Sequence, residues 1–131
     1  MIDQIWVPPA VHFWVGMAVL VTTLLSLLLT GIFAWRNWQL NRVGHAVLLL
    51  AQGSLMVQVL VGIKLLDQGL GPLQLYIHYL GGLGAFFFYL LLYWLPVRVR
   101  EARWTPFSLS SLAFLFAFMA FTIGSSYVAG T

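Results

Sequence analysis

With 131 residues, of which 62% are hydrophobic and only 7% charged, the chain has too little polar surface to cover a soluble core, so we expect an integral membrane protein. Its six Lys and Arg residues give a net charge of +3, but they lie in or beside short links between apolar segments, which indicates membrane topology and argues against a nucleic-acid partner. Because cysteine is absent, disulfides, thiolate-ligated zinc, iron–sulfur clusters and haem attached through CxxCH are excluded.

Four apolar segments of membrane-spanning length follow one another along the chain. They cover about residues 9–35, 43–66, 72–95 and 106–128, and each is close to the roughly 20 residues that a helix needs to cross about 30 Å of hydrocarbon. Because the links are short, successive helices are expected to be antiparallel neighbours within a single domain, residues 1–131. The predicted fold is therefore an all-α, antiparallel four-helix bundle in the membrane.

Proline and arginine residues mark the boundaries of these segments. Pro9, Pro72 and Pro106 suit the first turn of a helix, where a missing N–H costs nothing, and Pro96 ends the third segment. The first and third links hold all the arginines, which are Arg36, Arg42, Arg98, Arg100 and Arg103. By the positive-inside rule these links face the cytoplasm and both termini lie outside. We expect a multi-pass protein of a prokaryotic plasma (inner) membrane.

Two histidines lie at similar depth in the first and third segments. If these helices begin at Pro9 and Pro72, then His12 lies roughly 4.5 Å and His78 roughly 9 Å from the outer end. In an up-down bundle the first and third helices are diagonal partners, so inward-facing side chains at similar depth face each other across the core. A six-coordinate haem needs one imidazole on each side of the porphyrin, so we expect His12 and His78 to ligate one haem b.

Glycines follow both histidines at helical spacing. Gly16 lies one turn after His12, and Gly81 and Gly82 lie one turn after His78, so each glycine shares a helix face with an imidazole. A flat macrocycle could approach the backbone there. The alternative is that small residues let membrane helices pack closely against one another.

Other polar residues in the predicted spans leave alternatives open. Lys64, near the outer end of the second segment, either pairs with a haem propionate or extends to the interface as a snorkelling lysine. His45, at the cytoplasmic end of that segment, has no histidine opposite it, so it either bonds a headgroup or carbonyl or ligates a pigment or haem from one side. Gln52 and Gln58 either bond across helices or contact a quinone.

The sequence lacks the residues that several catalytic activities require. The acidic residues, Asp3, Asp67 and Glu101, all lie outside the predicted spans, so a proton relay through an intramembrane carboxylate is excluded. Ser125 and Ser126 have no nearby acid to complete a hydrolytic triad. We therefore do not expect the chain to be an enzyme on its own.

One block of the chain resembles a known family. The stretch Ala51 to Pro96, AQGSLMVQVLVGIKLLDQGLGPLQLYIHYLGGLGAFFFYLLLYWLP, resembles the helix pair of haem A synthase in which a helix with Gln and Gly, a short outer turn and an H-L-x-x-A-type helix start follow one another. The preceding VHFWVGMAVLVTTLL is similar to that family's span with a histidine at its outer end. The resemblance implies that His12 and His78 are the axial ligands of one b-type haem.

The chain also departs from that family. Pro9 stands where the family has a glutamate and Phe13 where it has an arginine, the outer-loop cysteines of some members are absent, and one bundle is present where the family has two. Haem-modifying catalysis is therefore not expected, whereas a single redox or structural haem is compatible with the comparison. Other small membrane cytochromes b are equally compatible.

The sequence favours a small membrane cytochrome b with one haem near the outer face, for electron transfer or as a haem-bearing subunit of a respiratory or photosynthetic complex. Two other classes remain open. One is a non-catalytic structural or assembly subunit of a larger membrane complex, without a cofactor. The other is a subunit whose single histidines ligate (bacterio)chlorophyll. The expected partners are the lipid bilayer and other membrane subunits of a redox complex.

Overall fold

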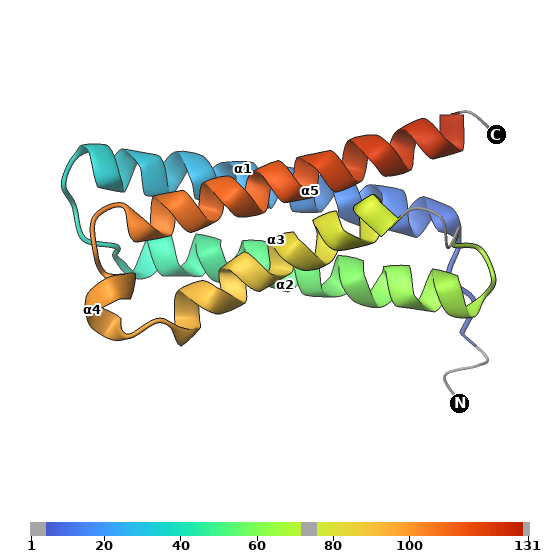
Figure 1. The fold of residues 1–131 in the computed structure, drawn as a ribbon, viewed down its shortest axis with the longest axis horizontal. Helices are drawn as coiled ribbons and strands as arrows, with labels where there is room; N and C mark the ends of the chain where they lie inside the picture. Colours follow the sequence, from blue (N-terminus) through green and yellow to red (C-terminus); the bar gives the residue numbers. More distant parts are fainter. Residues whose placement is uncertain (1–4, 72–75, 130–131) are drawn as a thin grey trace.

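The structure is a computed structural model that describes residues 5–71 and 76–129. Within these residues it contains helices and no strand. The helices are α1 (Pro9–Trp35), α2 (Arg42–Asp67), α3 (Tyr76–Trp94), α4 (Val97–Arg100) and α5 (Thr105–Ala129). Figure 1 shows the four long helices side by side, with the single turn of α4 at one end. These four are long and apolar enough to cross a membrane, which fits a multi-pass membrane protein.

The helix boundaries have local causes. Pro9 occupies the first turn of α1, and the side chain of Asn41 caps α2 by accepting a hydrogen bond from the backbone N–H of Gly44 at 3.0 Å. Helix α3 ends at Trp94, just before Pro96, as the sequence predicted. The predicted start of the third segment at Pro72 lies outside the described residues.

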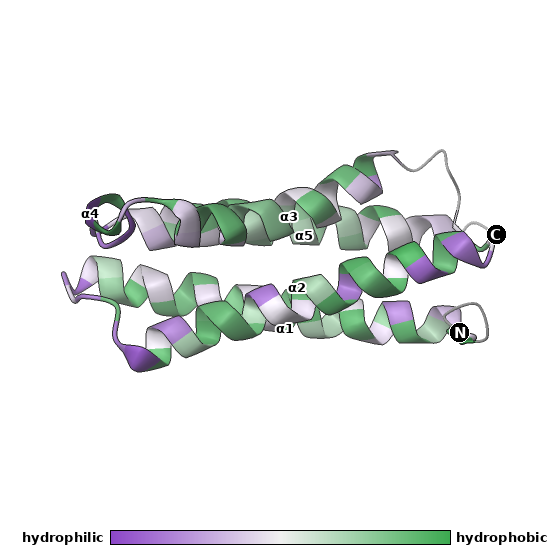
Figure 2. Ribbon diagram, turned by 90° about the horizontal axis from the view of Figure 1, so that it is seen from below, coloured by the Kyte–Doolittle hydropathy of each residue, from purple (hydrophilic) through white to green (hydrophobic). Residues whose placement is uncertain are grey.

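The four long helices form two layers, α1 with α2 and α3 with α5 (Figure 2). Helix α1 packs against α2 and α5, and α3 packs against α5 and α2, while α1 and α3 have no comparable contact. Helices α1 and α3 are therefore diagonal partners across the bundle. This arrangement places the side chains that the two helices direct inward opposite each other.

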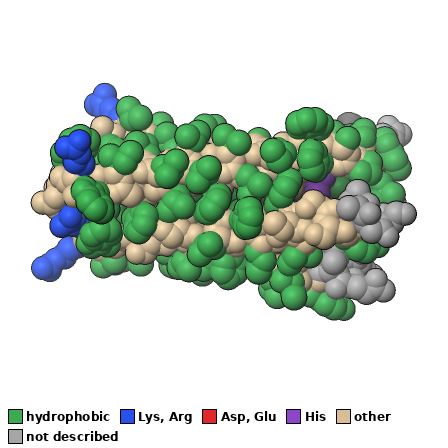
Figure 3. All heavy atoms as spheres, turned by 90° about the horizontal axis from the view of Figure 1, so that it is seen from above, with side chains coloured by type: hydrophobic (Ala, Val, Ile, Leu, Met, Phe, Trp, Pro, Cys, Tyr) green, Lys and Arg blue, Asp and Glu red, His purple; other side chains and the backbone are tan. Residues whose placement is uncertain are grey.

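Apolar side chains fill the interior and also cover the outside of the bundle. The inner cluster includes Leu48 and Leu55 of α2, Ala85 and Tyr89 of α3, and Ala113 of α5. Figure 3 shows hydrophobic side chains over the length of one face, with the basic side chains in view gathered at one end and a histidine visible toward the other. All four long helices also carry exposed large apolar side chains, which is what lipid-embedded helices require.

Small residues allow α3 and α5 to touch. Gly81 is buried, and a Cβ added there would lie 2.9 Å from the carbonyl oxygen of Phe116 and 2.8 Å from the Cβ of Ala120. At the neighbouring Gly82 an added Cβ would meet no atom within 4 Å. The two adjacent glycines therefore have different roles, and only Gly81 is needed for the contact between the helices.

This difference predicts opposite effects of one methyl group. Gly81→Ala should push α3 away from α5 and lower the free energy of unfolding by about 1–3 kcal/mol. Gly82→Ala should leave it unchanged or raise it by up to about 1 kcal/mol, because alanine has the higher helix propensity. Thermal unfolding in detergent, followed by circular dichroism, measures both. Equal losses of stability in the two variants would contradict the close contact at Gly81.

Candidate functional site

His12 of α1 and His78 of α3 meet across the diagonal of the bundle. Their ring centroids lie 5.8 Å apart, with the ring planes at 64°. Both side chains are half-buried. The structure thus brings together the two histidines that the sequence selected, in the half of the bundle opposite to α4.

Helix α2 supports the imidazole of His12. The amide nitrogen of Gln58 lies 3.2 Å from Nε2 of His12, and the ring lies beside Gly62, where an added Cβ would be in ordinary van der Waals contact with Cε1 at 3.4 Å. Nδ1 of His12 and Oε1 of Gln58 are buried and have no hydrogen-bond partner among the described residues. A buried polar atom without a partner costs free energy. These two atoms therefore mark a place where a ligand can satisfy polar groups.

Helix α5 supports the imidazole of His78. Nδ1 of His78 donates a hydrogen bond to the carbonyl oxygen of Ala120 at 2.7 Å. Gly124, one turn further along, lets the ring approach the helix, because an added Cβ there would lie 2.9 Å from the imidazole. With its hydrogen on Nδ1, the neutral ring carries its lone pair on Nε2. A bond from one ring nitrogen to a backbone carbonyl is the common arrangement of metal-ligating histidines.

The predicted glycines differ in their surroundings. Gly16 is buried, and an added Cβ there would lie 3.2 Å from the amide nitrogen of Gln58 and 3.3 Å from the ring of Phe121. Gly81 faces α5, as described above, and Gly82 has free space beside it. A macrocycle between the histidines would therefore require movement of Gln58 and Phe121.

Lys64 is engaged on its own helix. Its Nζ lies 2.5 Å from Oδ2 of Asp67, one turn further along α2, and the side chain of Lys64 is only 14% exposed. Gly62, which contacts His12, lies two residues before it. Lys64 thus lies at the histidine end of the bundle, where its partner in the structure is the carboxylate of Asp67.

His45 and Gln52 do not join this site. His45 lies near the opposite end of α2, where its ring centroid is 6.3 Å from that of Tyr93. The hydroxyl of Tyr93 is buried without a hydrogen-bond partner in the described part of the chain. Gln52 is half-buried on α2. Of the two glutamines left open by the sequence, Gln58 is the one that contacts a histidine.

The pair of imidazoles fits a metal held in a macrocycle better than a bare metal ion. Residues 5–71 and 76–129 contain no group of three or more side chains able to hold a metal ion, whereas zinc sites take three or four protein ligands. A haem iron needs one or two, because the porphyrin supplies the others. Two imidazoles are therefore a donor set of the kind that a haem iron accepts.

A buried polar stripe on α1 was not singled out from the sequence. Thr23, Ser26 and Thr30 are buried. Ser26 is hydrogen-bonded to the hydroxyl of Tyr89 on α3, while both threonines donate to backbone carbonyls of α1. The spacing of three and four residues is the signal that could have found this stripe. It joins the same diagonal helices as the histidines, nearer the middle of the bundle.

Comparison with known proteins gives no match. The chain matches no family model, no curated protein and no solved structure. Any function must therefore be argued from the residues described above.

The bond between Ser26 and Tyr89 predicts that two tyrosines of α3 differ in their contribution to stability. Tyr89→Phe removes the hydroxyl that links α3 to α1 and should lower the free energy of unfolding by about 1 kcal/mol. Tyr93→Phe removes a hydroxyl that has no described hydrogen-bond partner and should cost less than half as much. Unfolding by dodecyl sulfate in mixed micelles measures the difference. A larger loss in Tyr93→Phe than in Tyr89→Phe would refute the assignment.

Proposed function

We propose that the chain binds one haem b through His12 and His78 and is a small membrane cytochrome b. The proposal depends on one observation above all: imidazoles from two diagonal helices meet, with their ring centroids 5.8 Å apart and their ring planes at 64°. A haem iron accepts one imidazole on each face of the porphyrin. The resemblance to one half of haem A synthase points to the same pair of ligands.

When bound, the haem would supply a one-electron Fe(III)/Fe(II) couple. The protein groups would position and tune it. The carbonyl of Ala120 holds the His78 ring in the tautomer that presents Nε2 and makes that nitrogen more basic. The side-chain amide of Gln58 lies beside Nε2 of His12. With its oxygen turned to accept the Nε2–H, it would hold the His12 ring from α2 and leave the lone pair on Nδ1. The apolar side chains of the bundle keep bulk water from the site, which favours the less charged oxidation state of the iron.

The distribution of charge supports an orientation in the membrane. Arginines belong to the links at the α4 end, and His12 and His78 lie toward the other end, where Figure 3 shows a histidine at the surface. In the proposed topology the helices are antiparallel, the arginine links face the cytoplasm of a prokaryotic cell, and both termini lie outside with the histidine pair near them. The site would then exchange electrons with a partner at the outer face, either a separate carrier or another subunit of a redox complex.

The paired geometry favours haem over (bacterio)chlorophyll. A pigment-binding subunit uses single histidines that ligate magnesium from one side, whereas His12 and His78 approach from opposite helices toward each other. His45, which has no histidine opposite it, is the residue that a pigment would require. A purely structural subunit would gain nothing from two histidines that leave Nδ1 of His12 without a partner among the described residues.

Absorption spectroscopy of the purified protein tests the proposal. Protein produced with an adequate haem supply should show a Soret band and a reduced-minus-oxidised alpha band, and His12→Ala and His78→Ala should each abolish the six-coordinate spectrum. His45→Ala is the matched control and should keep it. Gln58→Leu should weaken haem binding about tenfold or more, because it removes the group that orients His12.

Circular dichroism separates loss of the ligand from loss of the fold. Each histidine variant should keep the helical spectrum of the parent protein. If the parent protein binds no haem at any haem concentration, or if a well-folded His78→Ala variant keeps an unchanged six-coordinate spectrum, the proposal is wrong.

A further inference from the structure

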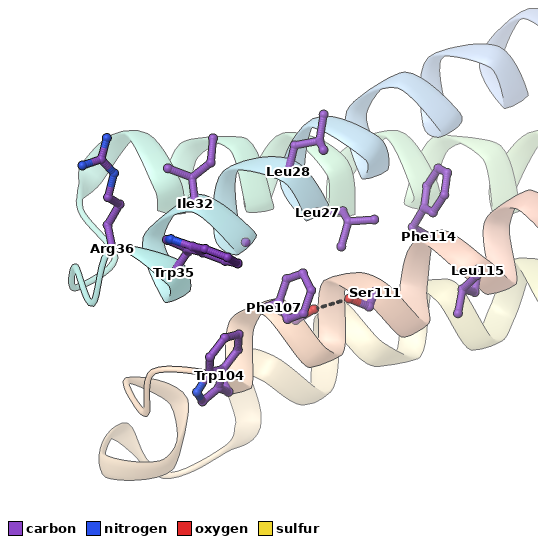
Figure 4. A pocket seen from close by; sticks show the side chains of 11 residues that line it. Leu27, Leu28, Ile32, Trp35, Arg36, Trp104, Phe107, Ser111, Phe114 and Leu115 are labelled. Atoms are coloured by element: carbon purple, nitrogen blue, oxygen red, sulfur yellow. Dashed lines mark hydrogen bonds between the residues drawn. The ribbon is translucent and has the colours of Figure 1, made fainter.

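An apolar groove lies between α1 and α5 at the end of the bundle that carries the arginines (Figure 4). Its volume is about 850 Å³, which is within the range of small-molecule sites, roughly 300–1,000 Å³. Leu27 and Phe107 lie along it, and the rings of Trp35 and Trp104 flank the end of the groove near Arg36, which is called its headgroup end below. The histidine pair does not line it.

The groove has the length of one membrane leaflet. From Arg36 to Leu27 helix α1 rises roughly 14 Å, which is about half of the 30 Å or so of hydrocarbon in a bilayer. Trp35 and Trp104 mark the interfacial level, where tryptophan concentrates in membrane proteins. The groove thus runs from the headgroup region to the middle of the membrane, as an acyl chain does.

Two arginines lie at the headgroup end of the groove. Arg36 lines it and is exposed, with its guanidinium 5.5 Å from the ring of Trp38. Arg103 donates hydrogen bonds to the carbonyl oxygens of Ala34 and Trp35, at 2.6 and 3.2 Å. Among the described residues the one ion pair is at the other end, so neither guanidinium has a carboxylate within 4 Å, although Glu101 lies in the same link as Arg103. A guanidinium without a carboxylate partner at the headgroup level attracts phosphate.

We propose that this groove binds an anionic phospholipid, with one acyl chain along the groove and the phosphate at Arg36. A quinone would need polar partners for its carbonyl oxygens within the groove. Ser111, the polar residue of its middle, donates its hydroxyl to the carbonyl of Phe107 at 2.8 Å on its own helix. A phospholipid needs no polar partner inside the groove, because its acyl chain is apolar and its phosphate would lie at the headgroup end, beside Arg36.

Native mass spectrometry of the full-length protein tests the role of Arg36. Dioleoylphosphatidylglycerol should bind at several-fold lower concentration than dioleoylphosphatidylcholine, which has the same chains and no net charge. Arg36→Gln should reduce binding of the anionic lipid to that of the neutral one, and Arg36→Lys should keep most of the preference. Arg98→Gln removes an exposed arginine of α4 outside the groove and should change nothing.

A second pair of variants tests the groove itself. Leu115, which is 58% exposed, lines the groove, and Leu112 on the same helix, 39% exposed, does not. Leu115→Trp should weaken binding of both lipids several-fold, and Leu112→Trp should leave both unchanged. Equal affinity of the parent protein for the two lipids, a preference that survives Arg36→Gln, or a quinone extracted from the purified protein would each overturn the proposal.

Discussion

Hydrocarbon offers no hydrogen-bond partners, so every polar group inside the bundle must find one in the protein. Most do: the Ser26 hydroxyl bonds to Tyr89, and Nδ1 of His78 bonds to the carbonyl of Ala120. Nδ1 of His12 and Oε1 of Gln58 are the exceptions at the histidine pair, since both are buried without a described partner. These two neighbouring atoms are the strongest physical reason to look for a ligand there.

The geometry of the site follows from helix packing. Because Gly81 lets α3 touch α5, the carbonyl of Ala120 comes within reach of His78, one turn earlier on α3. A larger residue at position 81 would hold the helices apart and leave Nδ1 of His78 unbonded. Gly124 adds the space that the ring itself occupies. Gly81 thus fixes the His78 ring indirectly, because it brings the carbonyl of Ala120 within hydrogen-bond distance of that ring.

Hydropathy and proline predicted the helix boundaries to within a residue or so. Which face of each helix turns toward the core was harder to infer. The first predicted span, 9–35, coincides with α1, and the predicted spans 43–66 and 106–128 differ from α2 and α5 by one residue at each end. Length and charge suffice for this because the membrane itself sets the span. That Gln58 bonds across helices was one of the two alternatives for it, but its partner His12 and the contact of Ser26 with Tyr89 were not predicted. A helix that is apolar on every side has no amphipathic pattern to show which face turns inward. The single turn α4 was missed because its four residues are too short for any periodicity.

The two ends of the bundle differ because imidazole and guanidinium differ in their ability to lose charge. A histidine can be neutral at physiological pH, so His12 and His78 can lie inside the bundle and offer lone pairs. An arginine keeps its charge at any accessible pH, so the arginines must remain where water and headgroups solvate them. The paired imidazoles lie at one end of the bundle, whereas the end with the arginines holds the single histidine His45. All five arginines lie at that end, and the groove beside Arg36 joins their charge to an apolar surface.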